Sequence, residues 1–147
     1  RGEAEAAIVL DEPHALAFLD HRPLFHGHCL LIPREHHETL ADLPADEVGP
    51  LFRTCRLLSR AVVDAMGAKG SFVALNNVVS QSVPHLHVHV VPRRPKDGLR
   101  GFFWPRTKYE SDEQMNEVAA AIHEHGALAG IGSGLWGGRF FVRRRRL

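Results

Sequence analysis

Histidine and aliphatic residues alternate from residue 85 to residue 90, and Val91 follows. Every second position is a histidine, and an aliphatic residue follows each one: His85, Leu86, His87, Val88, His89 and Val90. A period of two is that of a β-strand with one buried face. The pattern predicts a strand that directs the three imidazoles to one face and the three aliphatic side chains into the core.

Three further apolar runs have the length and the bounding residues of strands. Residues 15–19 end at the turn-prone sequence 20–23, and residues 28–32 are stopped by Pro33. Pro, Gly, Asn and Asp commonly bound strands. These two runs predict an antiparallel pair. Residues 71–76 predict another strand, which leads through a polar loop to the histidines.

Two segments carry apolar residues at helical spacing. The apolar positions of the first are Val48, Leu51, Phe52, Cys55, Leu58, Ala61, Val62 and Ala65. Gly67 is suited to end this helix, whereas Gly49-Pro50 leaves its start open. The second helix begins at Ser111, which forms a capping-box pattern with Gln114, and runs to about His125. Its apolar stripe consists of Met115, Val118, Ala119 and Ile122.

The composition suits one globular domain. The chain has 147 residues, of which 44% are hydrophobic and 24% charged, and this length buries a sizeable core. A formal net charge of +1 does not favour a nucleic acid or a membrane as partner. No apolar run has the length of a membrane span, and the first residues lack the pattern of a signal peptide.

The cysteines favour a reducing compartment. Cys29 and Cys55 lie in apolar segments and form no Cys-x-x-Cys pair, so we expect two buried free thiols. Free thiols are typical of the cytoplasm, where we expect the protein. Because the sequence begins with Arg1, a removed targeting segment stays an open alternative.

The composition changes after residue 125. Residues 126–147 are rich in glycine and contain four adjacent arginines. We expect residues 1–125 to form the domain and residues 126–147 to form a flexible tail. Adjacent arginines bind phosphates by salt-dependent attraction, which leaves an anionic partner open. The segment lacks elements that read a base sequence, so we expect no specific nucleic acid.

Three imidazoles on one face favour two kinds of chemistry. Neutral imidazoles ligate Zn²⁺, and three protein ligands leave a coordination position free. A neutral imidazole also attacks phosphorus, while its neighbours stabilise charge on the phosphoryl oxygens. The central His87 would then be the nucleophile. Nearby Asn76, Gln81 and Ser82 are hydrogen-bonding groups, and only a carboxylate from elsewhere in the chain would orient metal ligands.

Two blocks of sequence resemble the histidine triad (HIT) family of nucleotide hydrolases and transferases. One is residues 81–93 with Asn76 upstream, and the other is residues 18–23 and 27–33 with His36 or His37 beyond. The resemblance implies an α+β, HIT-like fold with a long central helix and a C-terminal helix. It also implies an antiparallel sheet of about five strands and assembly as a homodimer.

The resemblance further implies a reaction. A histidine attacks the α-phosphorus of a nucleotide, and water then hydrolyses the covalent nucleotidyl-histidine. His87 takes the place of the nucleophile, His85 organises its ring, and His89 contacts phosphate oxygens. His28 supports the triad, and Ser82 is a candidate for protonating the leaving group.

The implied nucleotide contacts extend beyond the triad. Asp20 matches a position that accepts hydrogen bonds from ribose hydroxyls, and His21 lies beside the base or sugar. Asn76, Gln81 and Ser82 match positions near the phosphate or leaving group, although Ser80 stands where the family commonly has glycine. The remaining histidines of this region are expected at the surface: His26, His36 and His37.

The resemblance implies an adenine nucleotide as substrate, either a dinucleoside polyphosphate, a phosphoramidate or a related mixed anhydride. No metal is expected for folding, because the zinc-binding cysteines of some relatives are absent. A divalent cation that accompanies the substrate stays open. Two alternatives also stay open: a metal-dependent hydrolase that uses the histidine face, and a nucleotide-binding regulatory protein without catalysis.

Overall fold

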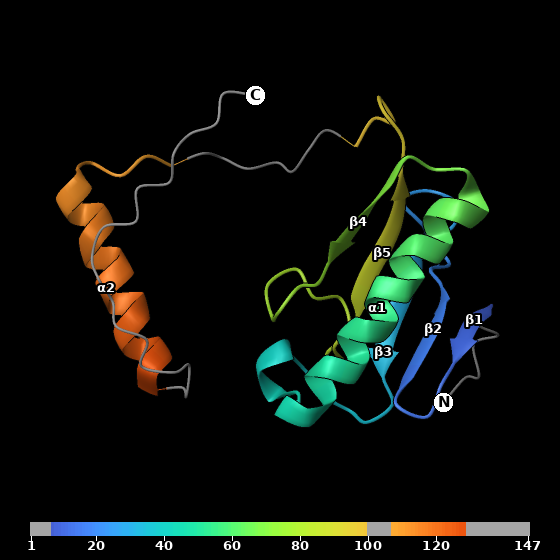
Figure 1. Ribbon diagram of the computed structural model, residues 1–147, viewed down its shortest axis with the longest axis horizontal. Helices are drawn as coiled ribbons and strands as arrows, with labels where there is room; N and C mark the ends of the chain where they lie inside the picture. Colours follow the sequence, from blue (N-terminus) through green and yellow to red (C-terminus); the bar gives the residue numbers. More distant parts are fainter. Residues whose placement is uncertain (1–6, 100–106, 129–147) are drawn as a thin grey trace. The chain divides into compact units, whose positions relative to one another are not determined.

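The computed structural model describes residues 7–99 and 107–128. These ranges belong to two compact units, which divide after residue 101. The first unit contains a five-stranded sheet and a long helix, and the second contains one helix (Figure 1). No helix in these two ranges combines the length and the apolar character that a membrane span needs.

The five strands form one sheet in the order β1-β2-β3-β5-β4. They are β1 (Ile8–Asp11), β2 (Ala15–Leu19), β3 (Cys29–Pro33), β4 (Gly70–Ala74) and β5 (Val88–Arg93). All neighbouring strands run antiparallel. The long helix α1 (Ala45–Met66) follows a 3-10 turn (Leu40–Asp42) and packs against β3, β4 and β5. The predicted α+β fold is therefore confirmed, including the antiparallel pairing of β2 with β3.

The core lies between α1 and one face of the sheet. Its members include Ala17 of β2, Leu31 of β3 and Leu58 of α1. The predicted burial of the aliphatic residues in the histidine segment is confirmed, since Leu86, Val88 and Val90 are all fully buried. Because side chains alternate along a strand, the intervening positions of β2, β3 and β5 face the other side of the sheet.

The histidine segment is a strand only in its second half. The prediction of one strand over residues 85–91 is wrong at its start, because β5 begins at Val88. Pairing with β3 ends at Leu31 and Val88, and continuing that register would set Leu86 opposite Pro33, which has no N–H to offer. The main-chain N–H of Leu86 donates instead to the carbonyl oxygen of His37, at 2.6 Å.

Other element bounds also differ from the prediction. β1 was not expected from the pattern of residues, because this edge strand leaves Ile8 and Val9 exposed and shows no alternation of burial. β4 covers residues 70–74 instead of 71–76, since its pairing with β5 ends at Ala74 and His89. α1 begins directly after Pro44 and contains Pro50. Gly67 ends it in the left-handed conformation, as predicted.

The second unit contains α2 (Asp112–Leu128), which extends beyond the predicted end at His125. Ser111 Oγ accepts a hydrogen bond from the N–H of Gln114, at 3.1 Å. The Gln114 side chain accepts its bond from the N–H of Glu110, not from that of Ser111 as in a capping box. Most of the predicted tail, residues 129–147, lies outside the described residues.

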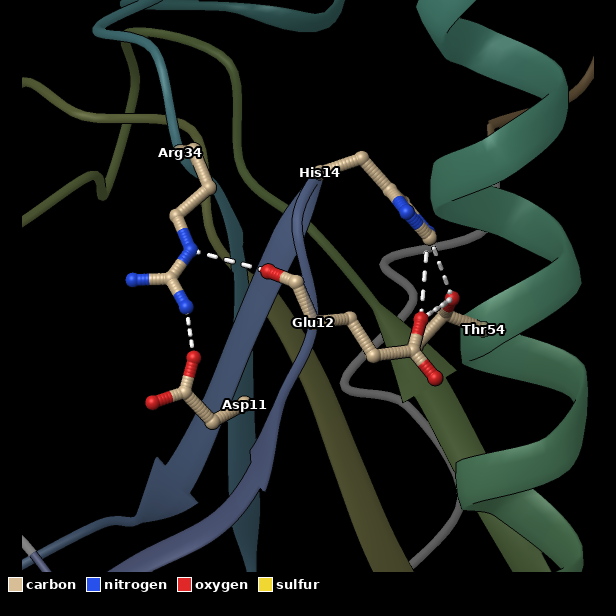
Figure 2. Close-up of polar contacts among 5 residues, drawn as sticks. All are labelled: Asp11, Glu12, His14, Arg34 and Thr54. Carbon is tan, nitrogen blue, oxygen red and sulfur yellow. Dashed lines mark hydrogen bonds and ion pairs between the residues drawn. The ribbon is translucent and has the colours of Figure 1, made fainter.

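A polar cluster attaches the β1–β2 hairpin to α1 (Figure 2). Thr54 of α1 is buried, and its hydroxyl donates to Glu12 Oε2 at 3.2 Å and lies 3.0 Å from His14 Nε2. Arg34, which follows β3, donates to the carbonyl oxygen of Glu12 and forms an ion pair with Asp11. The contacts of Thr54 tie the hairpin to α1, and those of Arg34 tie it to the end of β3.

Candidate active site

A cavity of about 490 Å³ opens on the face of the sheet away from α1. Its apolar floor consists of Phe18 from β2 and of Leu30 and Ile32 from β3. The other lining residues are Asp20, His21, Arg22, Ser82, Val83, His85, His87 and His89. This volume suits a small organic ligand. The structure therefore brings most of the predicted site residues to one cavity.

His87 is the most deeply placed histidine of the row, with 8% of its surface exposed. Its Nδ1 lies 2.7 Å from the main-chain oxygen of His85. A carbonyl oxygen only accepts hydrogen bonds, so Nδ1 carries the proton. In the neutral ring Nε2 then holds a free electron pair, which is the form a nucleophile or a base requires.

His28 precedes β3 and contacts His89 on β5. His28 Nδ1 accepts a hydrogen bond from the N–H of Leu24 at 3.2 Å, so the neutral ring carries its proton on Nε2. That nitrogen lies 3.0 Å from Nδ1 of His89 and donates to it. The proton of a neutral His89 is then on Nε2, which makes this histidine a hydrogen-bond donor through its other nitrogen.

Burial keeps these imidazoles neutral. It lowers the pKa of His28, an effect that the charge of Asp20 opposes. Burial also lowers the pKa of His85 and the pKa of His89, and neighbouring histidines lower both further. Near pH 7 the three rings are therefore uncharged, as the tautomers derived above require for His28 and His89.

The turn after β2 supplies the polar end of the cavity. Asp20 Oδ1 accepts a hydrogen bond from the N–H of Arg22 at 2.9 Å, and Oδ2 lies 3.7 Å from His28 Nδ1. That second distance is too long for a hydrogen bond, so Oδ2 is available to a ligand. The His21 side chain is 85% exposed. Gly27 closes this turn with φ +89°, a conformation that favours glycine.

His36 contacts the triad, which the sequence did not predict. Its Nδ1 lies 3.0 Å from Nδ1 of His85, although its side chain is exposed as expected. The surface prediction is wrong for His37, whose half-buried ring lies 3.7 Å from Glu47 of α1. His26 is exposed as predicted. The antiparallel register of β3 and β5, once known, would have indicated the contact between His36 and His85.

Two predicted nucleotide contacts do not line the cavity. The Gln81 amide donates to the carbonyl oxygen of Glu38 at 2.6 Å and accepts from the N–H of Val78 at 2.8 Å. Asn76 donates to the carbonyl oxygen of Ser80 at 3.3 Å. Both side chains hold the loop that precedes the histidines, in which Val78 has φ 66° and Ser80 has φ 62°. Their assignment as phosphate contacts stays a prediction.

One group of side chains within the described ranges has the donors for a metal ion. Asp20, His28 and His89 offer ligand atoms that all lie within 4.8 Å of one another. Two neutral imidazoles and a carboxylate suit Zn²⁺. This set shares only His89 with the predicted row of three histidines, because Asp20 and His28 come from the connection between β2 and β3.

The site and the fold define a class of protein, and comparison with known proteins agrees. A family model described as HIT domain matches residues 1–96. The chain therefore belongs to the HIT family. Adenylylsulfatase HINT3 of Arabidopsis thaliana is 30% identical over 132 residues, which are 85% of this chain and 65% of that protein. The chain thus spans just under two thirds of that relative.

Two further comparisons cover most of both chains. An uncharacterized HIT-like protein of Methanocaldococcus jannaschii is 33% identical over 119 residues, 80% of this chain and 92% of that protein. The crystal structure of a HIT family member from Bacillus subtilis superposes with a TM-score of 0.76 at 28% identity, over 84% of this chain and 89% of that one. The HIT fold thus extends over most of this chain and most of the protein from Bacillus subtilis.

Proposed function

We propose that this chain is a nucleotide hydrolase or transferase that attacks an α-phosphate through His87. The observation that carries the proposal is the 2.7 Å contact between His87 Nδ1 and the main-chain oxygen of His85. This contact commits Nδ1 to donation and leaves the electron pair on Nε2, in a ring that lines the cavity. Neutral neighbours let the electron pair persist near pH 7.

In the first step the Nε2 electron pair of His87 forms a bond to the α-phosphorus. The bond from phosphorus to the leaving group breaks, and the leaving group departs with its electron pair. Ser82, which lines the same cavity, passes a proton to it. The Nε2–H of His89 donates a hydrogen bond to a phosphate oxygen, where negative charge is concentrated, and His28 holds that tautomer of His89.

In the second step water attacks the phosphorus of the nucleotidyl-histidine. The phosphorus–nitrogen bond breaks, its electron pair returns to Nε2 of His87, and the water proton leaves with the solvent or with Ser82. An alcohol or a phosphate in place of water would make the same enzyme a transferase. His85 contributes through its carbonyl oxygen, which stabilises the proton on Nδ1 of His87 throughout.

The cavity also accommodates a nucleoside. Asp20 accepts hydrogen bonds from ribose hydroxyls through its unengaged Oδ2, with His21 beside the sugar or base. Phe18, Leu30 and Ile32 offer an apolar surface to the adenine ring. Asn76 and Gln81 adjoin the phosphate from their loop, and their present hydrogen bonds would have to change for direct contact.

The leaving group belongs to the same class as those of the relatives. The name of the plant relative indicates cleavage of a mixed anhydride of adenylate and sulfate, which supports substrates such as mixed anhydrides, phosphoramidates and dinucleoside polyphosphates. We place the protein in the cytoplasm, as a homodimer, since both cysteines are buried free thiols and the resemblance implies a dimer. A divalent cation that accompanies the substrate is compatible with this proposal.

Turnover by matched variants tests this function. Wild type, His87→Ala and His26→Ala are offered adenylyl sulfate, adenosine phosphoramidate and diadenosine tetraphosphate with a chelator present. We expect turnover by wild type and by His26→Ala, whose ring is exposed and outside the cavity. His87→Ala should lose all turnover. Activity of His87→Ala at the wild-type rate would refute the assignment of His87 as the nucleophile.

Two further measurements separate the alternatives. Intact-mass analysis after an alkaline quench should detect a nucleotidyl adduct on wild type and none on His87→Ala, because phosphorus–nitrogen bonds survive alkali better than acid. Nucleotide binding without turnover or adduct would favour a regulatory protein. Loss of turnover in chelator, with recovery on adding Zn²⁺, would favour a metal-dependent hydrolase.

A further inference from the structure

Both outer histidines of the row are hydrogen-bonded to a second histidine. His89 contacts His28 at 3.0 Å, and His85 contacts His36 at 3.0 Å. The ring centroids lie 5.2 Å apart in the first pair and 5.1 Å apart in the second. The two pairs differ in surroundings, because His28 is buried and His36 is exposed.

The sheet register accounts for this arrangement. β3 and β5 are antiparallel with Leu30 opposite His89. The residue before β3 therefore lies near the His89 end of the row, and the residues after β3 lie near the His85 end. His28 and His36 stand on either side of β3 in the sequence. One strand thus places a supporting histidine at each end of the row.

We propose that His36 is a positioning residue for the nucleophile, acting through His85. The inference rests on the proposed function of His87. The imidazole of His36 holds the ring of His85, and the main-chain oxygen of the same residue receives the Nδ1 proton of His87. A displacement of His85 therefore changes the orientation and the tautomer of the attacking ring.

The segment that carries His36 is fixed to the histidine segment at several points. The carbonyl oxygen of His37 accepts from the N–H of Leu86 at 2.6 Å, and that of Glu38 accepts from the Gln81 side chain at 2.6 Å. These contacts keep the segment folded when the His36 ring is removed, and neither of them involves the ring or the carbonyl oxygen of His85. Replacing His36 should thus alter the ring of His85 without unfolding the loop.

The contact between His36 and His85 contains one proton when both rings are neutral. Two Nδ1 atoms at 3.0 Å form one hydrogen bond, so one nitrogen donates and the other accepts. The titratable groups facing His85 are His36, His37 and His87, and Glu47 of α1 lies beside His37. A second proton on the pair would put a positive charge beside His87 and oppose the cation that forms there during attack.

The experiment compares wild type, His36→Ala, His36→Asn and His26→Ala. Asn is the conservative variant, because its amide nitrogen and oxygen approximate the position of Nδ1 and can bond to His85. Nitrogen-15 NMR of the imidazoles reports the tautomers of His85 and His87 in the free protein, and steady-state kinetics against pH report kcat and KM. Thermal melting of each variant monitors the fold.

We expect His36→Ala to shift the ring signals of His85 and His87 and to lower kcat about tenfold or more with KM nearly unchanged. The acid limb of its kcat profile should move. His36→Asn should recover most of kcat, and His26→Ala should match wild type in every measurement.

Unchanged ring signals in His36→Ala would overturn the proposal, and so would shifted signals with wild-type kcat and pH profile. The NMR measurement needs no substrate. If wild type turned over none of the nucleotides, the proposed function would fail, and shifted signals in His36→Ala would still establish that His36 positions these rings.

Discussion

Nε2 of His28 lies 3.0 Å from Nδ1 of His89, a residue 61 positions further along the chain. The N–H of Leu24 and the burial of the pair decide which nitrogen carries each proton. The hydrogen-bond donor of His89 that faces the cavity is therefore specified by the main-chain N–H of Leu24, in the turn between β2 and β3. His28, which does not itself react, thus determines which nitrogen of His89 carries the proton.

Replacing His28 by Ala should lower turnover by about ten to a hundredfold. His89 Nδ1 would lose its donor, and an unsatisfied polar group in a buried site costs about 1–3 kcal/mol. His89 would then populate the other tautomer, with no proton directed to phosphate. Steady-state kinetics measure kcat of His28→Ala, with His26→Ala as the control variant. Equal kcat in His28→Ala and wild type would contradict the tautomer assignment.

The folded protein should lose stability in mild acid. Burial lowers the pKa of His28, of His85 and of His89 from 6.5 in the folded chain, so the unfolded chain binds more protons just below that pH. The free energy of unfolding therefore falls as the pH falls below 6.5, and this contribution is complete above it.

Melting temperatures measured between about pH 7.5 and about pH 5 test this dependence. A midpoint that stayed constant or rose toward acid would contradict it. A further loss of folding stability is expected at lower pH. The hydrogen bonds from Arg93 hold the pKa of Asp97 at about 2, below its usual 3.8. His26→Ala should keep the wild-type slope, since that ring is exposed.

Gly27→Ala should be more destabilising than Gly98→Ala. Both glycines have a positive φ, +89° and +87°, which costs an L-residue about 1–2 kcal/mol. A Cβ at Gly27 would in addition lie 2.6 Å from Met66 Cγ, whereas a Cβ at Gly98 would meet nothing within 4 Å. Urea unfolding of both variants measures the difference, and equal losses would show that Met66 moves freely aside.

Removal of metal ions should leave turnover intact, and added Zn²⁺ should inhibit it. Zn²⁺ on Asp20, His28 and His89 would replace the hydrogen bond between the two histidines and occupy the phosphate donor. Calorimetric titration with ZnCl₂ should detect binding to wild type and weaker binding to Asp20→Asn. Tight stoichiometric zinc that activates the purified protein would contradict this expectation.

Much of the candidate site could be predicted from the sequence pattern alone. Alternation along residues 85–90 predicted the burial of Leu86 and Val88 and the gathering of the three imidazoles on one face, because a period of two separates the faces of an extended chain. That pattern did not predict where the strand begins. Pro33 lacks an N–H, so pairing with β3 stops before His87, and this depends on the partner strand.

The loop residues show the opposite case. Gln81 and Asn76 have the chemistry of phosphate contacts, and the structure uses both amides to hold the loop that contains Val78. An amide serves a backbone carbonyl as well as a phosphate. Only the position of Glu38, which is brought in by the segment after β3, decided between the two uses of Gln81.

The sequence by itself determined the chemical groups: a row of alternating imidazoles, a turn with Asp20 after residues 15–19, and the apolar positions that bury one face. The tertiary structure decided how those groups are protonated and paired. Contacts between His28 and His89, and between His36 and His85, depend on the antiparallel register of β3 with β5. Register joins residues that are distant in the chain, and no local pattern encodes it.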